Sequence, residues 1–317
     1  MTQTPATDQL DAVEALRANV ESVFVGRPEV VRLVLTGLLG GGHVLLEDVP
    51  GVGKTVLAKS LARSIDADFR RVQFTPDLLP GDILGTMVFD PRDASFRMRE
   101  GPVFTNVLLA DEINRATPRT QSALLEAMND GQVTIDRVSH ALASPFFVIA
   151  TQNPYEFEGT YPLPESQLDR FMLRLRIGYP SAEDERRIVR AQQRQHPLDS
   201  LKAVVHGDDV VRLQAAVRDV RVDDSVLDYA LELGRRTRQD KRLRVGASPR
   251  AAIALTRAAQ AHALLAGRTF VVPDDIKALA VAVLAHRLVA DSYVAEGGPD
   301  EREQVVKDLL DRVEVPV

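Results

Sequence analysis

The chain has 317 residues, of which 45% are hydrophobic and 26% are charged, as in ordinary soluble globular proteins. That length suffices for two domains, each able to bury its own core. Because there is no cysteine, disulfides, thiolate metal sites and a cysteine nucleophile are excluded. The net charge of −6 provides no overall basic field for nucleic acid, and with 5% aromatic residues and no Trp there is little for base stacking.

The first residues, MTQTPATDQLD, lack the basic and apolar regions of a signal peptide, and no apolar run is long enough to span a membrane. We therefore expect a cytoplasmic protein without membrane insertion. Residues 1–9 are expected to form a disordered polar tail. Apolar residues at helical spacing predict a helix that ends near Val23, and Pro28 suits the first turn of a second helix that ends near Leu39.

A glycine-containing loop, residues 47–55 (EDVPGVGKT), follows a predicted strand at 43–47 and precedes a predicted helix at 56–65. This layout is typical of a phosphate-binding loop, because backbone N–H groups and the helix N-terminus converge on one anion. Lys54 is expected to reach the β- and γ-phosphates of ATP, and the Thr55 hydroxyl to help hold Mg²⁺. The predicted nucleotide contacts of this loop are Pro50, Gly51, Val52, Gly53, Lys54, Thr55 and Val56.

The loop departs from the strict pattern G-x-x-x-x-G-K-[ST] at one position, where the chain has Asp48 in place of glycine. Gly51 and Gly53 remain to take unusual dihedral angles, and Pro50 stiffens the turn. The departure does not remove the features that a phosphate-binding loop needs.

Two acidic residues end the apolar run at 107–112, VLLADE. Such a run predicts a buried parallel strand, and ligands gather at the carboxyl ends of these strands. Asp111 is therefore expected to face Mg²⁺ and Glu112 to activate the attacking water. Another buried strand is predicted at 145–150, so Asn153 is expected at the same sheet edge, where its amide can position water against a γ-phosphate.

Two hairpins, at about 85–101 and 131–143, are predicted to be inserted among the strands and helices. The first is either functional or an idle surface hairpin. Further strands are predicted at 69–74 and 173–177, and from residue 181 the pattern becomes wholly helical. The sequence therefore predicts an α/β core at 10–180 with a five-stranded parallel sheet, followed by an all-α domain at 181–317.

The segments EDVPGVGKT, LLADEINRA, ATQNP, LPESQLDRF and GASPRA, in this order and spacing, resemble an AAA+ ATPase of the MoxR family, in the helix-2-insert clade. The resemblance covers residues 10–313 and implies a P-loop NTPase αβα core with a helical lid. It implies that Asp111 and Glu112 form the Walker B motif, that Asn153 is sensor 1, and that the two hairpins are the family's inserts.

The resemblance also implies roles for residues outside these strands. Arg170 matches the arginine finger, which acts on the nucleotide of a neighbouring subunit, and Arg250 matches sensor 2 on the lid. Val25 and Gly26 match the segment on the adenine side of the nucleotide. ATP is then expected between core and lid, with Arg250 beside Lys54 at the same γ-phosphate. Arg115 and Arg119 are further candidates for the subunit interface.

The function implied by the resemblance is ATP hydrolysis in a ring, by family likeness a hexamer, coupled to remodelling, maturation or metal insertion of client proteins. A partner with a von Willebrand factor type A domain is expected. Two alternatives remain open: a DNA-acting motor of the same clade, and a chelatase-type or Rubisco-activating subunit. A hairpin that grips DNA is expected to be net basic, whereas the first hairpin has Arg92, Arg97 and Arg99 against Asp90, Asp93 and Glu100.

Overall fold

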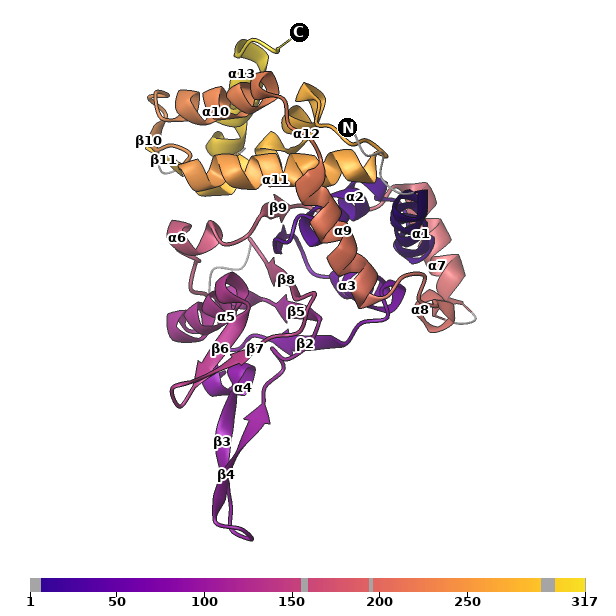
Figure 1. The fold of residues 1–317 in the computed structure, drawn as a ribbon, viewed down its shortest axis with the longest axis vertical. Helices are drawn as coiled ribbons and strands as arrows, with labels where there is room; N and C mark the ends of the chain where they lie inside the picture. The colour runs from indigo at the N-terminus through magenta and orange to yellow at the C-terminus, as the bar shows by residue number, and fades with distance from the viewer. Residues whose placement is uncertain (1–6, 155–158, 194–195, 292–299, 317) are drawn as a thin grey trace.

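The computed structural model describes residues 7–154, 159–193, 196–291 and 300–316. A central sheet lies between layers of helices, a helical region covers one end, and a long hairpin projects from the other end (Figure 1). In the part of the chain so described, no helix combines the length and apolarity needed to cross a membrane.

The central sheet has five strands in the order β2-β5-β8-β1-β9, and all its pairings are parallel. This arrangement confirms the predicted α/β fold with a five-stranded parallel sheet. The strands are β1 (Val44–Glu47), β2 (Phe69–Gln73), β5 (Val107–Asp111), β8 (Phe147–Gln152) and β9 (Leu173–Leu175).

The inner strands β5, β8 and β1 are buried on both faces, which explains why they are nearly continuous apolar runs rather than alternating ones. The edge strand β2 is mostly exposed. On β1, Val44 and Leu46 join a cluster with the helices of one layer, and Leu45 between them joins a second cluster under the opposite layer. Successive side chains of a strand point to opposite faces, so β1, β5 and β8 each contribute to both clusters.

The helices of the core are α1 (Thr7–Val23), α2 (Pro28–Leu39), α3 (Lys54–Ser64), α4 (Pro80–Leu84), α5 (Pro118–Asp130) and α6 (Glu165–Leu168), with a 3₁₀ turn η1 (Ile113–Arg115). Helix α1 begins at Thr7, so the expected tail at 1–9 is too long by three residues; residues 1–6 lie outside the described part. Helix α4 was not predicted, because its five residues are too few to show helical periodicity.

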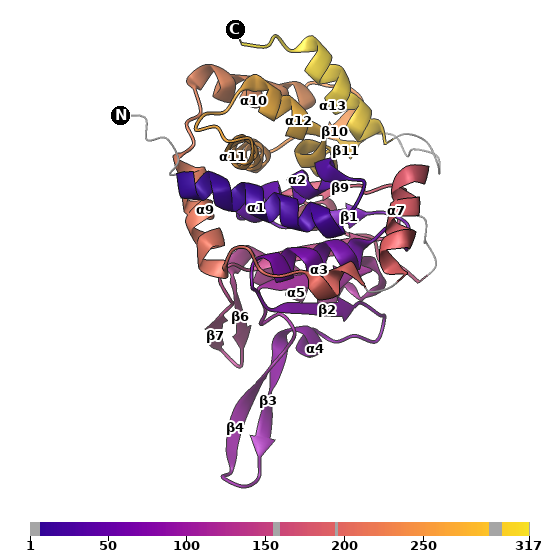
Figure 2. The same ribbon diagram turned by 90° about the vertical axis from the view of Figure 1, so that its right-hand side faces the viewer.

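The two hairpins are β3–β4 (Gly85–Asp90 with Ser95–Glu100) and β6–β7 (Gln132–Ile135 with Val138–Ala141). Figure 2 shows β3–β4 extending well away from the sheet and its helices, whereas β6–β7 stays close to them. The turn of β6–β7 consists of Asp136 and Arg137, both with positive φ, as a two-residue hairpin turn of the primed type requires.

The C-terminal part contains α7 (Ala182–Gln192), α8 (Pro197–Ser200), α9 (Gly207–Asp219), α10 (Asp224–Thr237), α11 (Pro249–Leu265), α12 (Pro273–Leu284), η2 (Ala285–Arg287) and α13 (Glu301–Arg312). The expectation of a wholly helical region was wrong in one detail. Strands β10 (Leu243–Val245) and β11 (Val289–Ala290) form a small antiparallel pair there.

The expected division at residue 180 does not separate two hydrophobic cores. One buried cluster runs from Leu16 and Leu35 in α1 and α2 to Leu255 in α11 and Leu279 in α12. Helices α9 and α7 stand at opposite ends of α1 and α3 (Figure 2), and the Val204 N–H donates to the Ser64 carbonyl at the end of α3. The C-terminal helices thus share apolar burial with the core, so their position depends on α1 and α2.

Candidate active site

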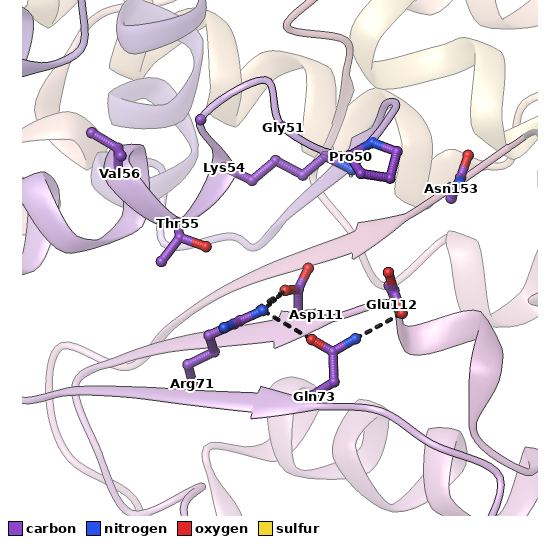
Figure 3. A pocket seen from close by; sticks show the side chains of 11 residues that line it. Pro50, Gly51, Lys54, Thr55, Val56, Arg71, Gln73, Asp111, Glu112 and Asn153 are labelled. Atoms are coloured by element: carbon purple, nitrogen blue, oxygen red, sulfur yellow. Dashed lines mark hydrogen bonds and ion pairs between the residues drawn. The ribbon is translucent and has the colours of Figure 1, made fainter.

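The phosphate-binding loop connects β1 to α3 and lines a cavity of about 340 Å³ at the carboxyl edge of the sheet (Figure 3). Gly51 and Gly53 have φ of 90° and 93°, values that favour glycine, and α3 begins directly afterwards at Lys54. The N-terminus of α3 therefore faces the cavity, as expected for an anion site. The lining residues are Pro50, Gly51, Gly53, Lys54, Thr55, Val56, Arg71, Gln73, Asp111, Glu112 and Asn153.

The Lys54 side chain turns back along the loop, and its Nζ donates to the Asp48 carbonyl oxygen at 2.5 Å. Partial burial lowers the pKa of Lys54, while the carboxylates of Asp48, Asp111 and Glu112 act to raise it. A phosphate group in the cavity would offer Lys54 a stronger, charged acceptor than this carbonyl.

Asp48, the departure from the strict loop pattern, fixes the start of the loop. Its Oδ2 accepts the N–H groups of Ile177 and Gly178 at 2.7 and 2.6 Å, just beyond β9, and its Oδ1 accepts the N–H of Val49 at 2.9 Å. A glycine at position 48 would leave the two N–H groups beyond β9 without this acceptor. Asp48 therefore joins the loop to the edge strand.

Asp111 ends β5, and both of its carboxylate oxygens are engaged. Thr151 Oγ1 donates to Oδ1 at 2.6 Å, and Arg71 on β2 donates to Oδ2 from Nη2 at 2.6 Å and from Nε at 3.1 Å. Figure 3 shows the Arg71 guanidinium between β2 and β5, at the floor of the cavity.

Glu112 has φ of 57°, in the left-handed region, which costs about 1 kcal/mol or more for a residue with a side chain. Its N–H donates to Thr151 Oγ1 at 2.9 Å. Its Oε2 accepts from Gln73 Nε2 at 2.7 Å and from Arg115 Nη1 at 3.1 Å. The carboxylate is thus held towards β2 and η1 in this structure, so it must turn before it can accept a proton from water in the cavity.

The residues present fit a magnesium ion. Thr55 and Asp111 line the same cavity and offer oxygen donors, which Mg²⁺ prefers. The described residues contain no cluster of three or more His, Asp or Glu side chains that could hold a metal by themselves. An ion here would therefore depend on phosphate and water for its remaining ligands, as is usual for Mg²⁺ with nucleotides.

A small second cavity lies beyond the loop, on the side expected for adenine. Val25 and Val56 line it together with Ile188 and Ala191 of α7 and His196 next to α8. Gly26 has φ of 90°, and a Cβ at this position would come within 2.8 Å of three side-chain atoms of Asp184. Glycine is therefore required at position 26 for the close approach of α7. The sequence analysis did not indicate that α7 is part of this site.

Arg250, expected beside Lys54, and Arg170, expected at the nucleotide of a neighbouring subunit, lie together away from the phosphate-binding loop. Arg170 and Arg250 line a cavity of about 260 Å³ between α6, η2 and the start of α11, and neither lines the cavity of the phosphate-binding loop. Arg170 Nη1 donates to the Leu125 carbonyl at 3.0 Å. The expectation that Arg250 acts beside Lys54 of the same chain therefore does not match its position here.

Asp169 is the acidic residue that lines this arginine cavity. Its Oδ1 accepts from Arg287 Nε at 2.8 Å, and its Oδ2 lies 3.9 Å from Arg250 Nε. Arg257 also lines the cavity, and its Nη1 is buried without a hydrogen-bond partner. Four arginines against one aspartate leave this cavity strongly positive, and the Arg250 side chain is 70% exposed.

Arg71, Gln73 and Asp48 are site residues whose contacts the sequence analysis did not foresee. Residue Gln73 pairs with Asp111 in the parallel register of β2 and β5, which places Arg71 two residues earlier on the same face. The polar residues of β2, an edge strand in which only Val72 is buried, were the available signal. Arg115, a candidate for the subunit interface, contacts Glu112 within the chain.

A parallel sheet with a phosphate-binding loop after β1, a Lys-Thr pair at the start of α3 and an acidic pair after a neighbouring strand defines a P-loop ATPase. The family model of "ATPase family associated with various cellular activities (AAA)" matches residues 43–173, and that of the "AAA lid domain" matches residues 235–309.

Relatives extend this assignment to the whole chain. The chain is 40% identical to "Chaperone MoxR1" of Mycobacterium tuberculosis, over 97% of this chain and 83% of that protein. It is 50% identical to "Uncharacterized protein YeaC" of Bacillus subtilis, over 94% and 93%. A crystal structure of a candidate ATPase from Cytophaga hutchinsonii is 38% identical and superimposes with a TM-score of 0.88, covering 98% of this chain and 96% of that one. The chain therefore belongs to the MoxR family of AAA+ ATPases, and it is an ATPase.

Proposed function

We propose that this ATPase hydrolyses Mg²⁺-bound ATP in a ring, by family likeness a hexamer, and uses the energy to remodel client proteins. In this proposal the Lys54 ammonium contacts the β- and γ-phosphates, and Thr55 and Asp111 hold the ion, which neutralises charge on the phosphates. Glu112 accepts a proton from the attacking water and Asn153 orients that water. Val25 and Gly26 lie on the adenine side.

The observation that supports assembly into a ring is the position of Arg170 and Arg250. Both lie outside the cavity of their own phosphate-binding loop. Both are exposed at the same cavity, one from the turn after α6 and the other from the first turn of α11. An arginine near a helix N-terminus is disfavoured by the helix dipole, so it gains most from an anionic partner. We infer that both arginines contact the γ-phosphate of the neighbouring subunit, in place of the mixed arrangement that the sequence predicted.

The projecting hairpin β3–β4 supports a protein client. Phe89 and Phe96 on this hairpin are 51% and 66% exposed, and their ring centroids are 5.2 Å apart. Arg97 forms ion pairs with Asp93 and Asp90 of the same hairpin. A paired arginine and an exposed aromatic pair suit a protein surface better than a DNA phosphate backbone.

Within this proposal the ATPase acts in the cytoplasm, with a partner that has a von Willebrand factor type A domain, on maturation or metal insertion of a client. The name of the Mycobacterium tuberculosis relative, a chaperone, supports such a role. Capture of proteins by the hydrolysis-deficient Glu112→Gln variant in ATP is the experiment that identifies the client.

Mixing of variant subunits tests the ring and the positions of both arginines. The double variant Arg170→Ala/Arg250→Ala is expected to hydrolyse ATP at least 10³-fold more slowly than the parent, because arginines that meet the transition-state charge are worth about 10³–10⁵ in rate. Addition of Glu112→Gln subunits should restore activity, since these supply both arginines to intact phosphate-binding loops.

The mixture separates three outcomes. Restored activity supports both arginines acting between subunits. If Glu112→Gln subunits restore the activity of the single variant Arg170→Ala but not that of the double variant, Arg250 acts within its own subunit. No restoration of either overturns the proposal. Arg212→Ala is the matched control, because Arg212 is an exposed arginine paired with Asp209 on α9, and this variant should keep the parent rate.

A further inference from the structure

A cation of the chain itself contacts the carboxylate that is expected to hold the magnesium ion. Arg71 Nη2 and Nε both donate to Asp111 Oδ2, at 2.6 and 3.1 Å, and Arg71 and Asp111 line the cavity of the phosphate-binding loop together with Thr55. The other oxygen, Oδ1, accepts from Thr151. Both oxygens of Asp111 are therefore engaged by side chains of the chain itself.

The charges of the cavity explain why Asp111 takes this partner. Lys54 is turned to the carbonyl oxygen of Asp48, and Glu112 is held by Gln73 and Arg115. The Asp111 side chain is only 16% exposed, so its negative charge is poorly hydrated and gains from a close cation. Arg71 supplies that cation from the neighbouring strand.

Arg71 is also free to leave. Its side chain is 47% exposed, and the acceptors found for it among the described residues are Asp111 and Gln73 Oε1, the latter at 2.9 Å. A half-exposed ion pair is worth little, so a divalent ion with its own phosphate ligands can displace it. Mg²⁺ and a guanidinium at the same carboxylate oxygen would repel each other, so the two compete.

We propose that Arg71 is a resident cation that holds Asp111 when Mg²⁺ is absent, and that Mg²⁺ binds with the nucleotide by displacing it. This inference rests on the proposed magnesium site. Displacement of Arg71 also removes its hydrogen bond to Gln73, the residue that holds Glu112 (Figure 3). Arrival of Mg²⁺ at Asp111 thereby weakens the contact that keeps the Glu112 carboxylate turned towards β2.

The test measures how strongly Mg²⁺ and nucleotide help each other to bind. The Kd of a fluorescent ADP analogue is measured in EDTA and in excess Mg²⁺. The ratio of the Kd in EDTA to the Kd in Mg²⁺ is then compared between the parent and Arg71→Met. Without Arg71, the bare Asp111 carboxylate repels metal-free phosphate, and Mg²⁺ no longer competes for Asp111. The ratio is therefore expected to rise about two- to five-fold, the range available to a half-exposed ion pair.

Two further variants make the result specific. Arg70→Met removes an arginine one residue earlier, on the opposite face of β2, and should leave the ratio at the parent value. In a chain that already carries Asp111→Asn, Arg71→Met should not change the Kd ratio further, since the two side chains act through one contact. Thermal melting establishes that each variant is folded.

The possible failures are distinguishable. If Arg71→Met weakens binding equally with and without Mg²⁺, Arg71 is a phosphate ligand and the inference is wrong. If the ratio is unchanged, Arg71 and Mg²⁺ do not compete and the inference is also wrong, although the magnesium site stands. If Mg²⁺ makes no difference to the parent, the magnesium site of the proposed function fails and this inference fails with it.

Discussion

At the scale of single residues, the acidic pair after β5 is prepared for two different tasks by different neighbours. Asp111 continues the strand and points into the cavity beside Arg71. Glu112 follows in a left-handed conformation, so its side chain departs from the strand direction and meets Gln73. Two consecutive carboxylates therefore face different partners, which suits one for metal binding and the other for proton transfer.

Replacement of two residues should separate nucleotide binding from hydrolysis. Lys54→Ala is expected to abolish nucleotide binding, because in the proposed function Lys54 contacts phosphate already in the ground state. Glu112→Gln should bind ATP with nearly the parent affinity and hydrolyse it about 10²–10⁴-fold more slowly, since a general base acts mainly in the chemical step. Calorimetry measures the binding, and phosphate release measures the turnover. Normal turnover by Glu112→Gln would show that another residue activates the water.

At the scale of elements, the hairpin β3–β4 is antiparallel and forms a sheet of its own, separate from the parallel central sheet. Its strands pair with each other in full register from Gly85 with Glu100 to Asp90 with Ser95. Its base packs against α4. A Cβ at Gly101, just after β4, would lie 2.2 Å from the carbonyl oxygen of Ile83 in α4, so glycine allows this close approach of the two backbones. The base of the hairpin is therefore fixed, whereas its far end is exposed.

The aromatic pair on this hairpin should be dispensable for folding and basal hydrolysis. In Phe89→Ser/Phe96→Ser, the melting temperature and the basal ATPase rate are expected to stay near the parent values, because both rings are more than half exposed. Phe74→Ser is the contrasting variant: Phe74 is fully buried, and its loss should destabilise the fold by about 3–5 kcal/mol. Loss of basal ATPase activity in the hairpin variant would place the aromatic pair in ring assembly rather than in client contact.

At the scale of the whole molecule, two buried histidines connect different layers. His43, just before β1, contacts the Met128 carbonyl in α5 through Nε2 at 3.0 Å and accepts the Val148 N–H through Nδ1 at 3.1 Å. These partners require neutral imidazole with its proton on Nε2. His286 in η2 contacts the Phe171 carbonyl at 3.0 Å and joins the helical end to the segment before β9.

Burial lowers the pKa of His43 from 6.5 to about 4, and burial and the nearby Arg287 charge lower the pKa of His286 well below its usual value. Between these values the unfolded chain binds more protons than the folded protein. The contribution of these two histidines to the free energy of unfolding is therefore constant above pH ~6.5 and decreases as the pH falls towards 4. His43 alone accounts for about 3 kcal/mol over that range.

Denaturant unfolding at pH 7, 6 and 5 checks this pH dependence. His43→Asn keeps an acceptor for Val148 but removes the titrating group, so it should be less stable than the parent at pH 7 and lose stability less steeply on acidification. If the free energy of unfolding decreases equally with falling pH in the parent and in His43→Asn, His43 is not a source of this pH dependence.

The sequence by itself determined the elements whose residues are contiguous. The phosphate-binding loop, the acidic pair and the five strands could be predicted, because a strand, a loop and the next helix follow one another along the chain and their residue types carry the local conformation. The parallel fold followed from continuous apolar runs, since only a sheet covered on both faces buries such strands. The family resemblance rested on the same contiguous segments.

Only the tertiary structure decided which distant residues meet. The register of β2 against β5 brings Arg71 to Asp111 and Gln73 towards Glu112. The packing of α11 against α2 fixes the lid so that Arg250 lies beside Arg170 rather than beside Lys54. Strand register and helix packing depend on the fit of whole surfaces rather than on local sequence pattern, so no motif revealed that the two arginines share a separate, positively charged cavity.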